Sequence, residues 1–253
     1  MEQSINIMTN RITNILIDNK PSIFLYGSVV LDDFKLGWSD IDIICLTDKA
    51  IQEKQADELV NLRQILLSEY QENPYFRLFE GSILTLEAFL NTADDTVIYW
   101  GTSGQRITNT YELCPFSKIE LLENGRLLYG DDFRHLISYP TRIEIIEAVR
   151  NHYESIRKYT HTPKSIRSTG SILDIARCLY TLKTMKVISK TKAGEWALEQ
   201  NLFFEKDVLE RIIEIRKNPI KYNNDEDTLK WIPSLASYIQ KFADILEAEL
   251  QTV

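Results

Sequence analysis

Glycine and proline are scarce in this chain, with 9 and 7 among 253 residues. Their scarcity excludes collagen-like and low-complexity architectures. Long apolar runs are also missing, because Asp42 interrupts even the run Ile41–Leu46, and no run approaches the ~20 residues that span a bilayer. The first residues lack the basic and apolar stretches of a secretory signal. We therefore expect a cytoplasmic protein with no membrane-spanning segment.

Cysteine and basic charge are limited as well. The three cysteines, Cys45, Cys114 and Cys178, show no paired spacing, so we expect reduced thiols. Lys and Arg total 29 against 37 Asp and Glu, which gives a net charge of −8. This balance disfavours extended binding to a nucleic-acid backbone and is compatible with a small cationic substrate. Apolar residues make up 44% of the chain, enough for a buried core.

The pattern of apolar residues changes at Tyr139-Pro140. Before it, strands are expected over 22–26, 39–46, 76–86, 97–100 and 126–129 (the last a strand or a turn), with helices over 4–19, 51–71 and 116–123. After it, helical periodicity covers 141–159, 169–185, 191–200, 204–217 and 225–250. The expected fold class is α+β, with a twisted mixed β-sheet flanked by helices in domain 1–139 and an all-α helical bundle in domain 140–253. A monomer is favoured over an oligomer.

The first chemically informative feature is Gly27-Ser28, at the end of the apolar run Ser22–Tyr26. Glycine has no Cβ, so at position 27 it allows a sharp turn and a close approach of the backbone to a ligand. Ser28 adds a hydroxyl and a backbone N–H group at the start of the next element. Such donors suit a phosphate, above all at a helix N-terminus.

The second feature is Ser39-Asp40-Ile41-Asp42-Ile43. Side chains alternate between the faces of a strand, so Asp40 and Asp42 share one face with Cα atoms about 6.6 Å apart. Two adjacent carboxylates repel each other unless a cation lies between them, and hard oxygen ligands suit Mg²⁺ together with substrate phosphates. Asp-x-Asp alone is more often a solvated strand face. Combined with Gly27-Ser28, it indicates Mg²⁺-dependent nucleotidyl transfer.

These two features resemble the signature of the polymerase-β-like nucleotidyltransferase superfamily. The phrases Leu25-Tyr-Gly-Ser28 and Ser39-Asp-Ile-Asp42 look most like those of the antibiotic nucleotidyltransferases. A second stretch, Leu173–Tyr180 followed by Ile188–Leu198, resembles the helical C-terminal domain of the streptomycin/spectinomycin (aminoglycoside) adenylyltransferases. The resemblance implies an N-terminal nucleotidyltransferase domain, a helical domain that closes the cleft, and an active site between the two.

The resemblance also implies nucleotide-binding residues. Gly27, Ser28 and Ser39 would bind the nucleotide in the first half of the chain, and Arg177 and Lys190 would contact the phosphates of ATP. Arg177 lies among apolar neighbours, where an unpaired charge is costly, so it should have an anionic partner. The alternative for Arg177 is a surface side chain with a solvated head group, and Lys192 is the alternative to Lys190.

A third carboxylate is expected from the same resemblance, in the strand after the long helix. Glu80 occupies that place within Phe76–Leu84, and its implied role is the general base that takes the proton of an acceptor hydroxyl. Glu87 is the competing candidate, in a helix-like stretch. The catalytic set expected from the sequence is therefore Asp40, Asp42 and Glu80, with Asp40 and Asp42 as metal ligands.

The expected reaction is Mg²⁺-dependent transfer of AMP from ATP to a hydroxyl of a small acceptor, with release of pyrophosphate. An aminoglycoside or aminocyclitol antibiotic of the spectinomycin or streptomycin type is the first candidate. The segment 159–169 departs from the family pattern, because it is basic, carries Lys164 and Arg167 and has no tryptophan. Either other acids face the cationic drug, such as Glu80, Asp174 or Glu147, or the acceptor is a different one. A lincosamide, a protein or tRNA therefore stays open as the acceptor, as does a non-enzymatic nucleotide-binding protein on the same fold.

Overall fold

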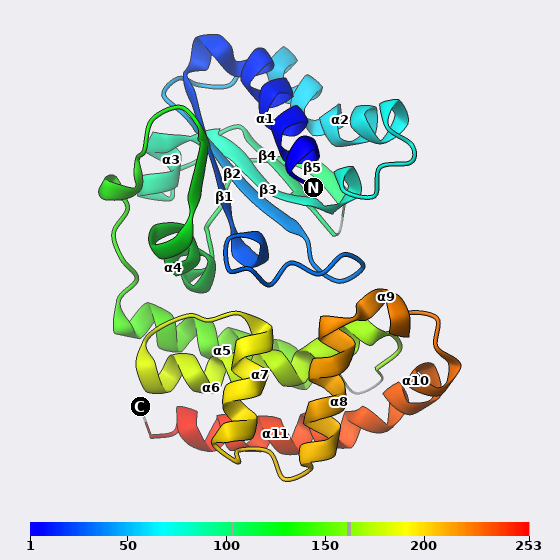
Figure 1. Cartoon of the computed structure of the whole chain (residues 1–253). Coiled ribbons are helices and arrows are strands. Elements are labelled where there is room, and N and C mark those ends of the chain that lie inside the picture. Colours follow the sequence, from blue (N-terminus) through cyan, green and yellow to red (C-terminus); the bar gives the residue numbers. More distant parts are fainter. Residues whose placement is uncertain (103, 161–162, 253) are drawn as a thin grey trace. The chain divides into compact units, whose positions relative to one another are not determined.

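The computed structural model describes residues 1–102, 104–160 and 163–252, so His161 lies outside the described residues. The chain divides into two compact units (Figure 1). Unit 1 comprises Met1–Asp32 and Asp40–Tyr139, and unit 2 comprises Asp33–Ser39 and Pro140–Val253. The short segment Asp33–Ser39 joins the two motifs of the first half of the chain, and it belongs to unit 2.

A six-stranded sheet forms the centre of unit 1, with the strand order β5-β4-β3-β2-β1-β6. The strands are β1 (Pro21–Tyr26), β2 (Ile41–Thr47), β3 (Phe79–Thr85), β4 (Val97–Gly101), β5 (Gly104–Thr108) and β6 (Arg126–Tyr129). β2 and β3 are parallel, and the other pairs are antiparallel. The mixed sheet expected from the sequence is therefore confirmed.

Helices cover both faces of this sheet (Figure 1). They are α1 (Glu2–Leu16), α2 (Glu53–Glu69), α3 (Leu86–Asn91) and α4 (Pro115–Asn124). Phe24, Ile44 and Leu84 pack with residues of α3 and α4 in one apolar cluster. Because side chains alternate along a strand, Leu25 and Ile43 point to the opposite face, and both are also buried. The central strands are thus buried on two sides, which explains their nearly continuous apolar sequence.

Unit 2 is helical, as expected. Its helices are α5 (Arg142–Tyr159), α6 (Gly170–Thr184), α7 (Lys190–Glu199), α8 (Lys206–Lys217), α9 (Pro219–Tyr222), α10 (Glu226–Trp231) and α11 (Leu235–Leu250). α6 packs against α5, α7 and α11 and so lies at the centre of the bundle. Gly194 permits a close approach of α7 to α6, since a Cβ atom there would lie 2.7 Å from Leu173 Cδ2.

Two local expectations from the sequence are corrected, and one strand was not expected. The strand expected over 76–86 begins only at Phe79, after a 3₁₀ turn. β5 was not expected, because its one large apolar side chain, Ile107, is exposed and gives no alternating pattern. The helix expected over 225–250 is two helices, α10 and α11, separated by a 3₁₀ turn that contains Pro233. Proline lacks the backbone N–H that a continuous helix needs at this position.

Candidate active site

Two of the expected catalytic carboxylates lie side by side at one edge of the β2–β3 ladder. Asp42 pairs with Glu80 across the parallel strands, and with Tyr26 across the antiparallel strands. Directly paired residues project to the same face of a sheet. Asp42 and Glu80 are both partly buried, and Asp40 directly precedes β2. The structure therefore brings Asp42 together with Glu80, while Glu87 is exposed on α3.

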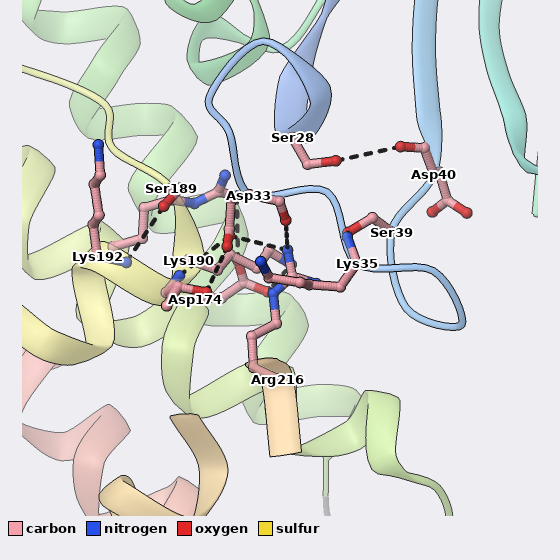
Figure 2. Close-up of polar contacts among 12 residues, drawn as sticks. Ser28, Asp33, Lys35, Ser39, Asp40, Asp174, Ser189, Lys190, Lys192 and Arg216 are labelled. Atoms are coloured by element: carbon pink, nitrogen blue, oxygen red, sulfur yellow. Dashed lines mark hydrogen bonds and ion pairs between the residues drawn. The ribbon is translucent and has the colours of Figure 1, made fainter. Parts of the chain in front are cut away.

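The Gly27-Ser28 turn contacts both Asp40 and Asp42. Gly27 has φ = +71°, and a Cβ atom there would overlap Oδ2 of Asp42 and lie 2.9 Å from its Cγ. The Ser28 hydroxyl donates a hydrogen bond to the Asp40 carbonyl oxygen at 3.4 Å (Figure 2). The element that follows is a single 3₁₀ turn, Gly27–Val29. The turn therefore lacks the aligned dipoles of an α-helix N-terminus, and Ser28 and the local backbone would have to supply the donors.

Sequence reasoning missed the tyrosines that surround Asp42. Burial raises the pKa of Tyr26 well above its usual value, and Tyr111 and Asp42 raise it further. Tyr26 and Tyr111 are hydrogen-bonded to each other. Tyr26 is therefore protonated at neutral pH. The alternation of β1 could have placed Tyr26 on the Asp42 face, but nothing in the sequence pairs it with Tyr111.

A buried arginine on α2 was missed as well. Arg63 is 7% exposed, and its guanidinium donates to the Phe79 carbonyl at 3.0 Å and to the Gly101 carbonyl at 3.3 Å. Burial lowers the pKa of Arg63, and the charges of Glu80 and Asp40 oppose that shift. Hydrogen bonds to β3 and to the end of β4 thus fix the positive charge of Arg63 near Glu80 and Asp40.

A cavity of about 440 Å³ opens in unit 1. Its lining includes Tyr99, Arg106, Tyr111 and Glu112. Tyr99 pairs with Ser82 across β3 and β4, and Ser82 lies two residues after Glu80, so this aromatic side chain projects on the carboxylate face. The cavity combines aromatic rings with charged groups, as small-molecule sites commonly do.

Unit 2 gathers the other expected residues around Asp174. Lys190 Nζ lies 2.9 Å from Asp174 Oδ2, and Arg177 Nη2 lies 3.2 Å from Asp174 Oδ1 (Figure 2 shows the Lys190 pair). Asp174 thus supplies the anionic partner that the apolar neighbours of Arg177 lead one to expect. Burial alone would raise the pKa of Asp174, but Lys190 and Arg177 outweigh it and lower that pKa to about 2.

His152 on α5 is near this cluster. Burial lowers its pKa; Asp174 acts in the opposite direction, and Arg177 and Lys190 lower it further. His152 is therefore neutral at pH 7. With one carboxylate and two basic groups, the cluster carries an excess of one positive charge, which suits an anion.

The first turn of α7 distinguishes Lys190 from Lys192. Ser189 is the N-cap, and its hydroxyl accepts from the Lys192 backbone N–H at 3.3 Å. Lys190 turns toward Asp174, whereas the Lys192 side chain is exposed. Lys190 is therefore the lysine that α7 presents next to Arg177.

Ser39 belongs to the segment of unit 2 that lies between the two motifs. Its side chain is buried, and its hydroxyl accepts a hydrogen bond from the Lys35 backbone N–H at 3.0 Å. The hydroxyl therefore closes a turn of the loop. A role of Ser39 in nucleotide binding stays a prediction.

Asp40 and Asp42 could hold a divalent cation. No three His, Cys, Asp or Glu side chains are assembled as a metal site in the ranges 1–102, 104–160 and 163–252. Mg²⁺ does not need such a cage, because it is usually bound through one or two carboxylates together with waters and substrate phosphates. A pair of aspartates beside the Gly27 turn fits that requirement. The described part of the chain contains no helix long and apolar enough to cross a membrane.

Known protein families match both halves of the chain. Residues 11–128 match the family profile of the nucleotidyltransferase domain, and residues 140–241 match the C-terminal domain of aminoglycoside adenylyltransferase. The crystal structure of spectinomycin adenyltransferase AAD(9) from Enterococcus faecialis, with ATP and spectinomycin, aligns with a TM-score of 0.62 at 16% identity. The alignment covers 98% of this chain and 99% of that one. The curated proteins gave no significant match.

The chain is therefore a nucleotidyltransferase. Within that class it resembles the aminoglycoside adenylyltransferases, as the two sequence stretches indicate. The crystal structure shares its α+β fold.

Proposed function

We propose that this enzyme transfers AMP from ATP to a hydroxyl of a small, cationic antibiotic of the aminoglycoside or aminocyclitol type, releasing pyrophosphate. The observation that carries the proposal is the in-register pair Asp42 and Glu80, with the Gly27 turn against Asp42. The aligned crystal structure, which contains ATP and spectinomycin, supports both the nucleotide and the acceptor class.

Asp40 and Asp42 would hold Mg²⁺ in this proposal. When bound, Mg²⁺ neutralises charge that develops on the transferred phosphoryl group. Gly27 serves the site by leaving room for the Asp42 carboxylate. Tyr26 and Tyr111 surround that carboxylate and, with Tyr26 protonated, add no charge of their own.

Glu80 would act as the general base. Its carboxylate accepts the proton of the acceptor hydroxyl, whose oxygen attacks the α-phosphorus of ATP as the bond to pyrophosphate breaks. A general base has to be ionised at the working pH. Arg63 supports this state, because a buried positive charge near Glu80 stabilises the carboxylate.

Arg177 and Lys190 would bind the phosphates that leave as pyrophosphate. Asp174 holds both basic groups on its two oxygens and so restricts their rotamers before the nucleotide binds. Ser28 would add a hydroxyl donor on the side of the carboxylates. That the carboxylates of unit 1 and the basic residues of unit 2 act on the same nucleotide is part of this proposal.

The acceptor would bind in the cavity of unit 1. Tyr111 offers flat apolar surface to a sugar or cyclitol ring, and Glu112 offers a negative charge to an amine. The Arg106 guanidinium covers the Tyr99 ring, with its carbon 4.1 Å from the ring centre. Lys164 and Arg167 are exposed on the segment that departs from the family pattern. Because both are cationic, that segment offers no negative charge to such an acceptor. We therefore assign its recognition to the cavity, where Glu112 is present beside Arg106.

The test is mass spectrometry of spectinomycin, streptomycin and a lincosamide after incubation with the protein, Mg²⁺ and ATP. A gain of one AMP on a member of the panel identifies the reaction and the acceptor class. Asp42→Asn, which keeps size and shape, should abolish the gain. If no member changes although ATP binds, the antibiotic assignment is wrong and protein or tRNA hydroxyls become the candidates. Full turnover by Asp42→Asn would refute the metal assignment.

A further inference from the structure

A second acidic residue, Asp33, is buried in unit 2 although it comes from the loop between the two motifs. Its side chain is 6% exposed and pairs with Arg216 of α8, itself 4% exposed, at 3.1 Å. Arg216 also donates to the Asp33 backbone carbonyl at 3.1 Å. A buried charge pair with this much hydrogen bonding fixes the position of the loop, since moving either partner would leave a charge uncompensated.

The same carboxylate binds the first turn of α7. The Thr191 hydroxyl donates to Asp33 Oδ1 at 2.6 Å, and the Thr191 backbone N–H donates to Asp33 Oδ2 at 3.3 Å. Thr191 directly follows Lys190, the first residue of α7. The helix start thus has two acceptors, Ser189 from its own chain segment and Asp33 from the loop. A carboxylate at this end of a helix is favourable both as a cap and against the helix dipole.

The rest of the loop is packed so that Asp33 cannot easily leave. Trp38 is 6% exposed and clusters with Ile166, Ile215 and Ile232. The Arg216 guanidinium carbon lies 5.2 Å from the centre of the Trp38 ring. Arg216 therefore contacts the loop at both ends, through the Asp33 carboxylate and through the aromatic ring (Figure 2 shows the Asp33 end).

We propose that Asp33 is a positioning residue for Lys190. By binding both donors of Thr191, Asp33 holds the first turn of α7 in place, and this turn directs the Lys190 ammonium group to Asp174 beside Arg177. The proposal rests on the proposed function, in which Lys190 binds the phosphates of ATP. Asp33 itself does not touch the nucleotide in this scheme. It acts through the backbone that carries Lys190.

The first test measures α7 without nucleotide. Thr191→Val removes the hydroxyl donor and keeps the side-chain shape, Thr191→Ser keeps the donor, and Thr13→Val is the control, because the buried Thr13 hydroxyl on α1 has no hydrogen-bond partner within the described residues. We expect faster amide hydrogen exchange at residues 190–193 in Thr191→Val, normal exchange in Thr191→Ser, and no change there in Thr13→Val. Unchanged exchange in Thr191→Val would overturn the anchor.

The second test asks whether the anchor acts through Lys190. ATP affinity, measured by calorimetry well below the melting temperature, should fall at least about threefold in Thr191→Val and recover in Thr191→Ser. In a Lys190→Gln background, Thr191→Val should cause no further loss, because the residue that it positions is gone. An equal loss in both backgrounds would show a general structural effect and overturn the proposal. If the wild-type chain binds no ATP, the proposed function fails, and the exchange measurement decides the anchor alone.

Discussion

Gly27 leaves no room for a side chain beside Asp42. Its φ of +71° is a conformation that glycine adopts freely, and a Cβ atom there would overlap the Asp42 carboxylate. The turn and the carboxylate are therefore fitted to each other, although they come from different strands.

Gly27→Ala should combine backbone strain with displacement of Asp42. We expect a loss of about 1–3 kcal/mol in unfolding free energy and a loss of turnover larger than the stability change explains. Gly104→Ala is the matched control, because Gly104 also has positive φ (+104°) but nothing lies within 4 Å of its would-be Cβ. Thermal melting and AMP transfer would be measured for both variants. Equal turnover in the two would argue that Asp42 has no role.

Glu80→Gln should remove the base while keeping the size of the side chain. We expect turnover to fall by about 10²–10⁴-fold, the range typical of general-base catalysis, with ATP affinity nearly unchanged. Glu87→Gln, on the exposed second residue of α3, is the control and should retain full rate. The readout is the rate of AMP incorporation into whichever acceptor the antibiotic panel reveals. If Glu87→Gln lost turnover and Glu80→Gln retained it, Glu87 would be the base.

Lys190→Gln should weaken ATP binding by about tenfold, as expected for the loss of one partly buried charge-assisted contact. Lys192→Gln should leave the affinity within about twofold, because an exposed lysine contributes little. Both substitutions remove one positive charge from neighbouring positions of the same helix, so long-range electrostatics affects them alike. Calorimetric titration with ATP distinguishes them, and similar losses would contradict a specific role of Lys190.

Asp174 should make unfolding free energy depend on acid pH. Its folded pKa of about 2 lies below the ordinary value of 3.8, so its stabilising contribution is complete above about pH 4 and is lost as pH falls toward 2. The shift corresponds to about 2 kcal/mol. Urea unfolding between pH 6 and pH 2 should therefore show a shallower decline in Asp174→Asn than in the wild type. A parallel decline in the two proteins would mean that Lys190 and Arg177 do not stabilise this carboxylate.

Much of unit 1 could be predicted from local sequence. The apolar runs that end at Tyr26 and begin at Ile41 are strands, and Asp42 and Glu80 each lie in an expected strand. The parallel register that pairs Asp42 with Glu80 was not predicted, because it depends on contacts between distant segments. β5 escaped prediction because an edge strand with one exposed apolar residue carries no pattern. The helix break at Ile232–Ser234 could have been inferred from Pro233. The helical periodicity on both sides of Pro233 led instead to the expectation of one continuous helix.

Contacts between distant residues were beyond sequence reasoning. Asp33 stands beside Asp32 in a loop and has the composition of a solvated turn, while its partner Arg216 is 183 positions away. Nothing local distinguishes a buried ion pair from two surface charges. Arg63 was hidden in the same way, since a charged residue in an amphipathic helix normally faces water.

The assignment of Asp33–Ser39 to unit 2 constrains how the gene could be divided or recombined. A cut between Tyr139 and Pro140 would leave the C-terminal fragment with Arg216 buried and without its carboxylate, and would leave the N-terminal fragment with Trp38 stripped of its apolar neighbours. Exchange of the helical half between related enzymes would break the same contacts unless the seven residues Asp33–Ser39 were exchanged together with it. Chimeras should therefore be built with three crossovers, two that flank Asp33–Ser39 and one between Tyr139 and Pro140.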